Sequence, residues 1–99
     1  MAQVAREHRP AWLIDKDLAN LLGFWRGVPE LAGEWPAWDE ISRLNVIHDW
    51  PIERETLQRV VDASAAGLLN ERQKCEWLEL SRLIETHRDT VEQMLGEPI

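Results

Sequence analysis

The sequence predicts an all-α protein: a compact four-helix domain that ends in an αα-hairpin with a long C-terminal helix. Apolar side chains recur at the three- and four-residue spacing of amphipathic helices in several segments. No segment shows the period-two run of β-branched residues that indicates a strand. Because 99 residues is close to the commonest domain size, we expect residues 1–99 to form one domain. Residues 1–10 are polar and aperiodic, and we expect them to form a flexible arm.

A first helix is expected from about Lys16 to Arg26. Asp15 is available as its N-cap, and Gly27 follows its last residue. Residues 27–33 are rich in turn formers, so we expect them to be a connector. The first helix is predicted by one apolar stripe at i, i+3, i+4 and i+7, which consists of Leu18, Leu21, Leu22 and Trp25.

Two Trp-Pro pairs, Trp35-Pro36 and Trp50-Pro51, each precede acidic residues and an apolar periodic run. Proline suits the first helical turn because its φ is preset and its missing N–H is not needed there, and early carboxylates complement the helix dipole. We therefore expect a short second helix from Pro36 to about His48 and a third from Pro51 to Gly67. The apolar positions of the second helix are Trp38, Ile41, Leu44 and either Ile47 or His48.

The C-terminal hairpin has the clearest local signals. Gly67 lies where a left-handed helix end is expected, and Asn70 with Gln73 makes a capping-box pattern. From Glu71 the pattern stays helical to Leu95 and stops at Gly96. A third helix of only about 16 residues would cover part of this last helix, so the sequence predicts an apolar seam that needs a partner. The seam has strict 3, 4, 3, 4, 3 spacing and consists of Trp77, Leu80, Ile84, His87, Val91 and Met94.

The charge balance argues against binding of nucleic acid. The net charge is -7, and both halves of the chain are acidic. Nucleic-acid binding draws much of its affinity from cations that neutralise phosphates. The alternative, a nucleic-acid-associated regulator, would need the arginines of the hairpin on one face: Arg54, Arg59, Arg72 and Arg82.

The cellular setting follows from the cysteine count and the apolar runs. A single cysteine, Cys75, cannot close an intrachain disulfide, and the charged residues 6–9 interrupt any signal-like apolar run. The longest apolar runs are far shorter than the ~20 residues that cross a bilayer. We expect a cytoplasmic protein without a membrane partner.

No constellation of residues predicts chemistry. Cys75 and His87 are twelve residues apart on one helix, or ~18 Å by rise. The histidines and the cysteine lack metal-ligand spacing, and no glycine-rich phosphate loop is present. We therefore predict no catalytic residue, cofactor, metal or small-molecule ligand. A small enzyme that uses Cys75, His48 or His87 is the remaining alternative.

After the apolar seam of the last helix, the second feature that bears on function is the presence of six tryptophans in 99 residues. Trp25 and Trp77 fall on apolar stripes and are expected in the core. The others lie in or beside loops and helix starts, where they either cover the ends of the core or form an exposed rim that anchors a partner. We predict an acidic, non-catalytic interaction or accessory module that binds a protein partner or itself. The expected partner-binding residues are Trp35, Trp38, Trp50, Trp77, Ile84, His87 and Val91.

One segment resembles a known group of proteins. Residues 66–73, Ala-Gly-Leu-Leu-Asn-Glu-Arg-Gln, with Trp77, Leu80 and Leu83 after them, resemble the C-terminal helical hairpin of short bacterial proteins, some of them antitoxin-like. The resemblance covers about residues 57–95. It implies a small acidic regulator, whereas the missing basic arm argues against one that binds DNA to repress itself.

Overall fold

The computed structural model describes residues 10–98, which are almost entirely helical. The described residues contain no strand, so the predicted all-α, four-helix class is confirmed. The expected arm, residues 1–10, lies outside the described residues except for Pro10. The elements are α2 (Ala11–Arg26), α3 (Val28–Glu34), the 3-10 turn η1 (Trp35–Ala37), α4 (Glu40–Ala65) and α5 (Glu71–Leu95).

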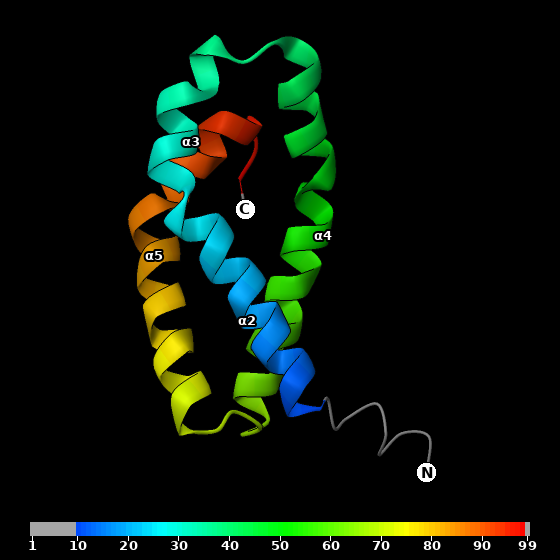
Figure 1. Cartoon of the computed structure of the whole chain (residues 1–99), viewed down its shortest axis with the longest axis vertical. Coiled ribbons are helices and arrows are strands. Elements are labelled where there is room, and N and C mark those ends of the chain that lie inside the picture. Colours follow the sequence, from blue (N-terminus) through cyan, green and yellow to red (C-terminus); the bar gives the residue numbers. More distant parts are fainter. Residues whose placement is uncertain (1–9, 99) are drawn as a thin grey trace.

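The two long helices, α4 and α5, run antiparallel along the longest dimension of the molecule, and α2 crosses between them (Figure 1). The molecule measures 49 × 27 × 21 Å. α5 packs mainly against α2 and α3, and α4 packs mainly against α2. The C-terminal hairpin is therefore open, because its arms meet the shorter helices rather than each other.

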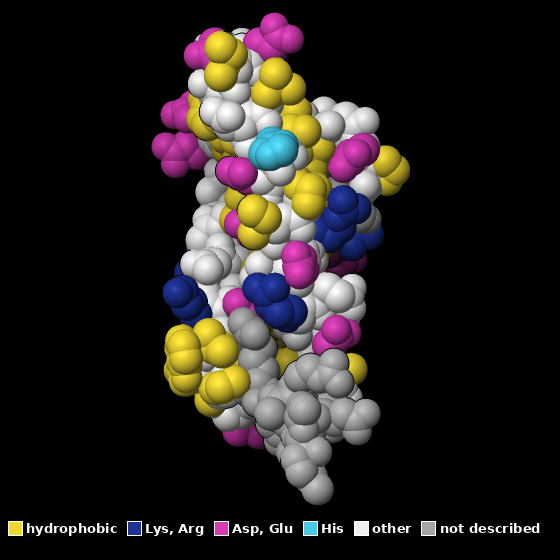
Figure 2. All heavy atoms as spheres, turned by 90° about the vertical axis from the view of Figure 1, so that its right-hand side faces the viewer, with side chains coloured by type: hydrophobic (Ala, Val, Ile, Leu, Met, Phe, Trp, Pro, Cys, Tyr) yellow, Lys and Arg dark blue, Asp and Glu magenta, His cyan; other side chains and the backbone are white. Residues whose placement is uncertain are grey.

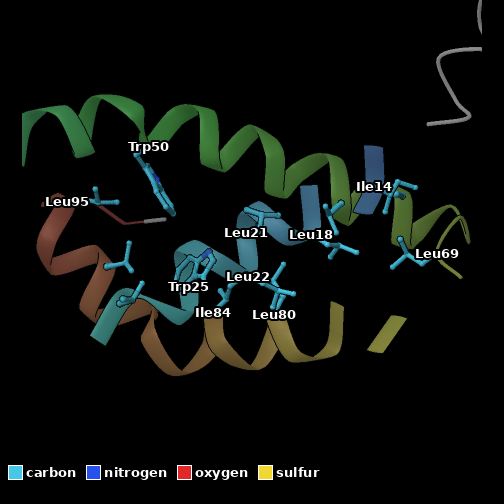
Figure 3. Packing of buried hydrophobic residues seen from close by; sticks show 14 residues of the cluster. Ile14, Leu18, Leu21, Leu22, Trp25, Trp50, Leu69, Leu80, Ile84 and Leu95 are labelled. Carbon is cyan, nitrogen blue, oxygen red and sulfur yellow. The ribbon is translucent and has the colours of Figure 1, made fainter. Parts of the chain in front are cut away.

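The core lies where the inner faces of α4 and α5 meet α2 (Figure 3). The predicted stripe on α2 is confirmed, because each of its four members is at most 4% exposed. No helix among residues 10–98 has both the length and the apolar character that a membrane span requires. The buried apolar cluster consists of Ile14, Leu18, Leu21, Leu22, Trp25, Val28, Trp50, Val60, Ala63, Leu69, Leu80, Ile84, Val91 and Leu95.

α2 begins five residues earlier than expected, at Ala11, with Pro10 at the N-cap position. The extra turn places Ile14 in the core, where it is 1% exposed. Asp15 is therefore not a cap. Its carboxylate Oδ1 accepts hydrogen bonds from Gln73 Nε2 and Arg72 Nη2, both at 2.8 Å, which joins α2 to α5.

The expected connector at residues 27–33 is wrong, because most of it is α3. Gly27 has helical dihedrals (φ -84°), so the chain bends there and continues as helix. Pro29 falls in the first turn of α3, where its preset φ favours a helix. Val28 is fully buried, and this burial favours the helical turn over an open loop.

The expectation that each Trp-Pro pair starts a helix is also wrong. Trp35-Pro36 forms η1, and α4 begins at Glu40, where Asp39 is the N-cap and its Oδ1 accepts from Ser42 N at 2.7 Å. Pro51 lies inside α4, which continues through it. The burial of Trp50 and Val60 on the two sides of this proline holds both halves of α4 against the core.

The turn between α4 and α5 confirms the local predictions. Gly67 has a left-handed φ of 74°, and the amides of Leu68 and Gly67 donate to carbonyls of the last turn of α4 at 3.0 and 3.1 Å. The capping box is present, since Gln73 N donates to Asn70 Oδ1 at 2.8 Å and Asn70 N donates to Gln73 Oε1 at 2.9 Å. α5 ends at the left-handed Gly96.

The helix lengths remove the expected reason for an uncovered seam. α4 has 26 residues and α5 has 25, so the predicted mismatch in length is wrong. α2 and α3 cover the seam positions Leu80 and Val91 completely, and Ile84 is 8% exposed. The accessible apolar surface that remains lies between α4 and α5, and it includes the seam positions Trp77 and Ile84.

Candidate interaction surface

A groove of about 530 Å³ lies between the C-terminal half of α4 and the middle of α5. The groove is a consequence of the open hairpin. α2 packs between α4 and α5 on the core side and keeps the two helices apart, so a gap remains between them on the other side. The groove is lined by Leu57 and Val61 of α4 and by Trp77, Ser81, Ile84, Glu85, Arg88 and Asp89 of α5.

The α4 wall is apolar, and the α5 wall changes from apolar to charged toward solvent. Leu57 and Val61 are one helical turn apart, and Val61 is 37% exposed. Trp77 and Leu57 also pack against the buried cluster, which fixes their positions. On α5, Glu85 and Arg88 supply both signs of charge at the rim. The surface thus has an apolar floor with polar edges, which is the usual composition of a protein interface.

A second aromatic site lies just before α4. The rings of Trp35 and Trp38 are 5.8 Å apart, and Arg43 Cζ lies 5.8 Å from the Trp35 ring centre. Arg43 also donates from Nε to the Trp35 carbonyl at 3.0 Å and from Nη2 to the Pro36 carbonyl at 2.8 Å. Both tryptophans are half-buried. We call these three residues the Trp35 corner.

The Trp35 corner and the groove are separate. Leu57 is seventeen residues after Glu40, where α4 begins, and this separation is roughly 25 Å by rise. The structure therefore does not bring Trp35 and Trp38 together with Trp77. Of the predicted partner-binding residues, only Trp77 and Ile84 line the groove.

Two of the predicted partner-binding residues are in the core. Trp50 is 3% exposed and packs at 5.7 Å from Phe24 and 6.2 Å from Trp25, measured between ring centres. Val91 is fully buried. Neither contributes to a surface of this structure. His87 is half-buried on α5 and does not line the groove.

Two apolar positions of the expected second helix are exposed on α4. Ile41 and Leu44 are 74% and 54% exposed, and Ile52 is 64% exposed. Figure 2 faces the α4 side and shows hydrophobic side chains gathered around the single visible histidine. The inner face is instead set by Ile47 and Trp50. α4 continues through Pro51 without a break. One outer face of this helix therefore carries all three of the exposed residues Ile41, Leu44 and Ile52.

Among residues 10–98, three carboxyl groups have shifted pKa values. Burial, and then the nearby charge of Asp49, raises the pKa of Glu53. Hydrogen bonds from Gln73 and then Arg72 lower the pKa of Asp15. The hydrogen bonds from Ser42 lower the pKa of Asp39 at its capping position. Glu53 Oε2 is buried and has no hydrogen-bond partner, so the raised pKa reflects a carboxylate that the fold does not compensate.

The residues of the alternative functions lie as follows. His48 is exposed on α4, and Cys75 is exposed on α5. Within residues 10–98, no three His, Cys, Asp or Glu side chains form a group that could hold a metal ion. Two of the four hairpin arginines face carboxylates: Arg59 lies 3.6 Å from Asp17, and Arg72 lies 2.8 Å from Asp15.

No family model, curated protein or solved structure matches the chain.

Proposed function

We propose that the chain is a small, acidic, non-catalytic interaction module that binds a partner protein in the groove between α4 and α5. The observation that carries this proposal is an apolar floor, built from Leu57, Val61 and Trp77, that remains open to solvent although its walls are anchored in the core. A surface on rigid helices needs little reordering on binding, so less affinity is lost to conformational entropy.

The shape of the groove favours a helical segment of the partner. The α5 wall runs from Trp77 to Asp89, a distance of twelve residues or about 18 Å, which is slightly more than three helical turns. An amphipathic helix would place apolar side chains at i, i+3 or i+4, and i+7 on the floor. The charges of Glu85 and Arg88 at the rim would then favour a partner helix that carries complementary charges beside those apolar side chains.

The charge of the whole chain favours a basic partner. With a net charge of -7, the protein attracts positively charged molecules over distances of about a Debye length. The single exposed Cys75 supports a reducing, cytoplasmic setting for this encounter. A small acidic binder of a basic protein agrees with the antitoxin-like resemblance of residues 57–95.

The test compares binding by the wild-type chain with binding by Val61→Glu, which places a charge on the groove floor. The matched control is Leu78→Glu, which adds the same charge at an apolar α5 residue that is 55% exposed and does not line the groove. The tagged proteins capture partners from the source organism. We expect a specific protein that the wild type and the control retain and that Val61→Glu loses. A Val61→Glu variant that is folded by circular dichroism and retains every partner would contradict the proposal.

The antitoxin-like form of the proposal has a narrower test. The captured protein, expressed alone, should arrest growth of its host, and co-expression of the wild-type chain should restore growth. Val61→Glu should not restore it, and Leu78→Glu should. A captured protein without any effect on growth would contradict the antitoxin-like interpretation, and the more general proposal of an interaction module would stand.

A further inference from the structure

The outer face of α4 carries an apolar stripe that residues 10–98 leave exposed. Ile41, Leu44 and Ile52 are 74%, 54% and 64% exposed, and His48 between them is exposed as well. At 100° per residue these four side chains fall within about 80° of arc, on the side of α4 away from Trp50. We call these four residues the outer stripe. It is distinct from the groove, which lies toward the other end of α4.

The outer stripe is complementary to itself when two copies of α4 are placed antiparallel. In that arrangement residues at equal separations on either side of residue 47 lie opposite each other. Ile41 is six residues before this point and Ile52 is five residues after it, so Ile41 of one copy lies opposite Ile52 of the other to within one residue, about 1.5 Å along the helix axis. Leu44 is three residues before this point and His48 is one residue after it, so these two side chains of opposite copies lie about two residues, or ~3 Å, out of register.

Two pairs of polar residues on the flanks obey the same symmetry. Glu40 and Arg54 are each seven residues from residue 47, lie on the same flank of the stripe, and are both exposed. Asn45 and Asp49 are each two residues from it, on the opposite flank, and are also exposed. Since like flanks face each other in an antiparallel pair with two-fold symmetry, both pairs join complementary groups: an ion pair and an amide–carboxylate hydrogen bond.

We propose that the outer stripe of α4 binds a second copy of this chain, with the two α4 helices antiparallel about residue 47. The contact is isologous, so each copy contributes the same residues. The stripe from Ile41 to Ile52 is only about 17 Å long, which corresponds to an interface below the standard size and to a dimer that dissociates on dilution. Dimerisation leaves the groove free for the partner proposed above.

The first experiment measures mass by sedimentation equilibrium from ~10 μM to ~1 mM, the range in which small interfaces associate. We expect the mass of the wild-type chain to rise from 11.5 kDa toward twice that value. Ile52→Glu should raise the dissociation constant at least tenfold, whereas the control Leu78→Glu should leave it unchanged. A wild-type mass of one chain at ~1 mM would overturn the proposal, and so would equal effects of the two folded variants.

The second experiment tests orientation and register by charge reversal. Arg54→Glu and Glu40→Arg should each weaken the dimer, because each places like charges opposite each other, and the double variant should recover the wild-type dissociation constant. A parallel pair or a different register would not give this recovery. A double variant that is weaker than both single variants would overturn the antiparallel arrangement about residue 47.

The third comparison separates this proposal from the proposed function. Val61→Glu changes the groove and should leave the dissociation constant of the dimer unchanged, while Ile52→Glu should leave capture of the partner protein unchanged. If Val61→Glu disrupted the dimer and Ile52→Glu did not, self-association would occur through the groove, and the outer stripe would not be the dimer interface.

Discussion

Gln73 shows how one side chain serves both local and tertiary structure. Its Oε1 accepts from Asn70 N to complete the capping box, while its Nε2 donates to Asp15 Oδ1 at 2.8 Å and to the Ala11 carbonyl at 3.2 Å. The residue is fully buried, and all of its polar atoms have partners. The capping box was predictable from a spacing of three residues. The bonds to α2 were not, because they join positions about 60 residues apart.

Removal of the cap should weaken the whole fold modestly. Asn70→Ala deletes the side-chain oxygen that accepts from the backbone N–H of Gln73, so we expect a loss of about 1 kcal/mol in the free energy of unfolding. The matched control is Asn20→Ala, which replaces an exposed asparagine inside α2 and should be neutral or slightly stabilising. Urea denaturation of both variants measures the difference. Equal stabilities would show that the cap does not contribute.

Glu53 is expected to destabilise the protein at neutral pH. Its folded pKa is raised, by burial first and by Asp49 second, so the ionised form costs more in the folded state than in the unfolded chain. Its favourable contribution is complete only below the unfolded pKa and is lost as the pH rises through the folded pKa. Glu53→Gln should therefore raise the melting temperature at pH 7 by a few degrees, and this gain should disappear below about pH 4.

The control for this prediction is Glu55→Gln. It removes the same charge from an exposed position on α4, so it should change the melting temperature little at either pH. A Glu53→Gln variant that is less stable than the wild type at pH 7 would show that the buried carboxylate has a favourable partner.

At the scale of elements, α4 differs most from the prediction. The signals at Trp50-Pro51 are those of a helix start, and by local preference the chain should begin a helix there. The structure continues the helix because apolar residues on both sides of Pro51 bury against α2, and this burial outweighs one missing backbone hydrogen bond. α5 was predictable to the residue, since both its ends are fixed by local groups: the capping box at Asn70 and the left-handed Gly96.

Replacement of Pro51 distinguishes a helix interior from a helix start. Pro51→Ala should restore an N–H donor to the Ile47 carbonyl and raise the free energy of unfolding by about 1–3 kcal/mol. The control is Pro36→Ala in η1, where proline suits the first turn and its loss should destabilise by less than about 1 kcal/mol. Chemical denaturation measures both. Destabilisation by Pro51→Ala would indicate that the protein needs the bend that proline imposes.

At the scale of the molecule, the sequence predicted which residues form the core better than it predicted which apolar residues remain exposed. Trp77 and Ile84 belong to the candidate groove and were identified from the heptad spacing. The exposure of Leu57 and Val61 was not predictable from periodicity, because it depends on where α2 lies between α4 and α5. The outer stripe was missed for the same reason, since periodicity gives the existence of an apolar face but not its direction.

The tryptophans should divide into two energetic classes across the molecule. Trp25 is fully buried and packs edge-on against Phe24, with ring centres 5.6 Å apart, so Trp25→Ala should cost about 3–5 kcal/mol. Trp12 is 65% exposed, and Trp12→Ala should change the free energy of unfolding by no more than about 0.5 kcal/mol. Urea denaturation of both variants provides the comparison. Similar losses would contradict the assignment of the core to the α2–α4–α5 junction.

The central position of α2 determines when the protein can fold during its synthesis. α2 is the first described helix to be made, yet its apolar face packs against α4 and α5, which are made after it. The nascent chain therefore exposes the tryptophan-bearing surface of α2 until α5 has been synthesised. We expect the core to form only after α5 has left the ribosome, with chaperones that recognise apolar segments bound to α2 in the meantime.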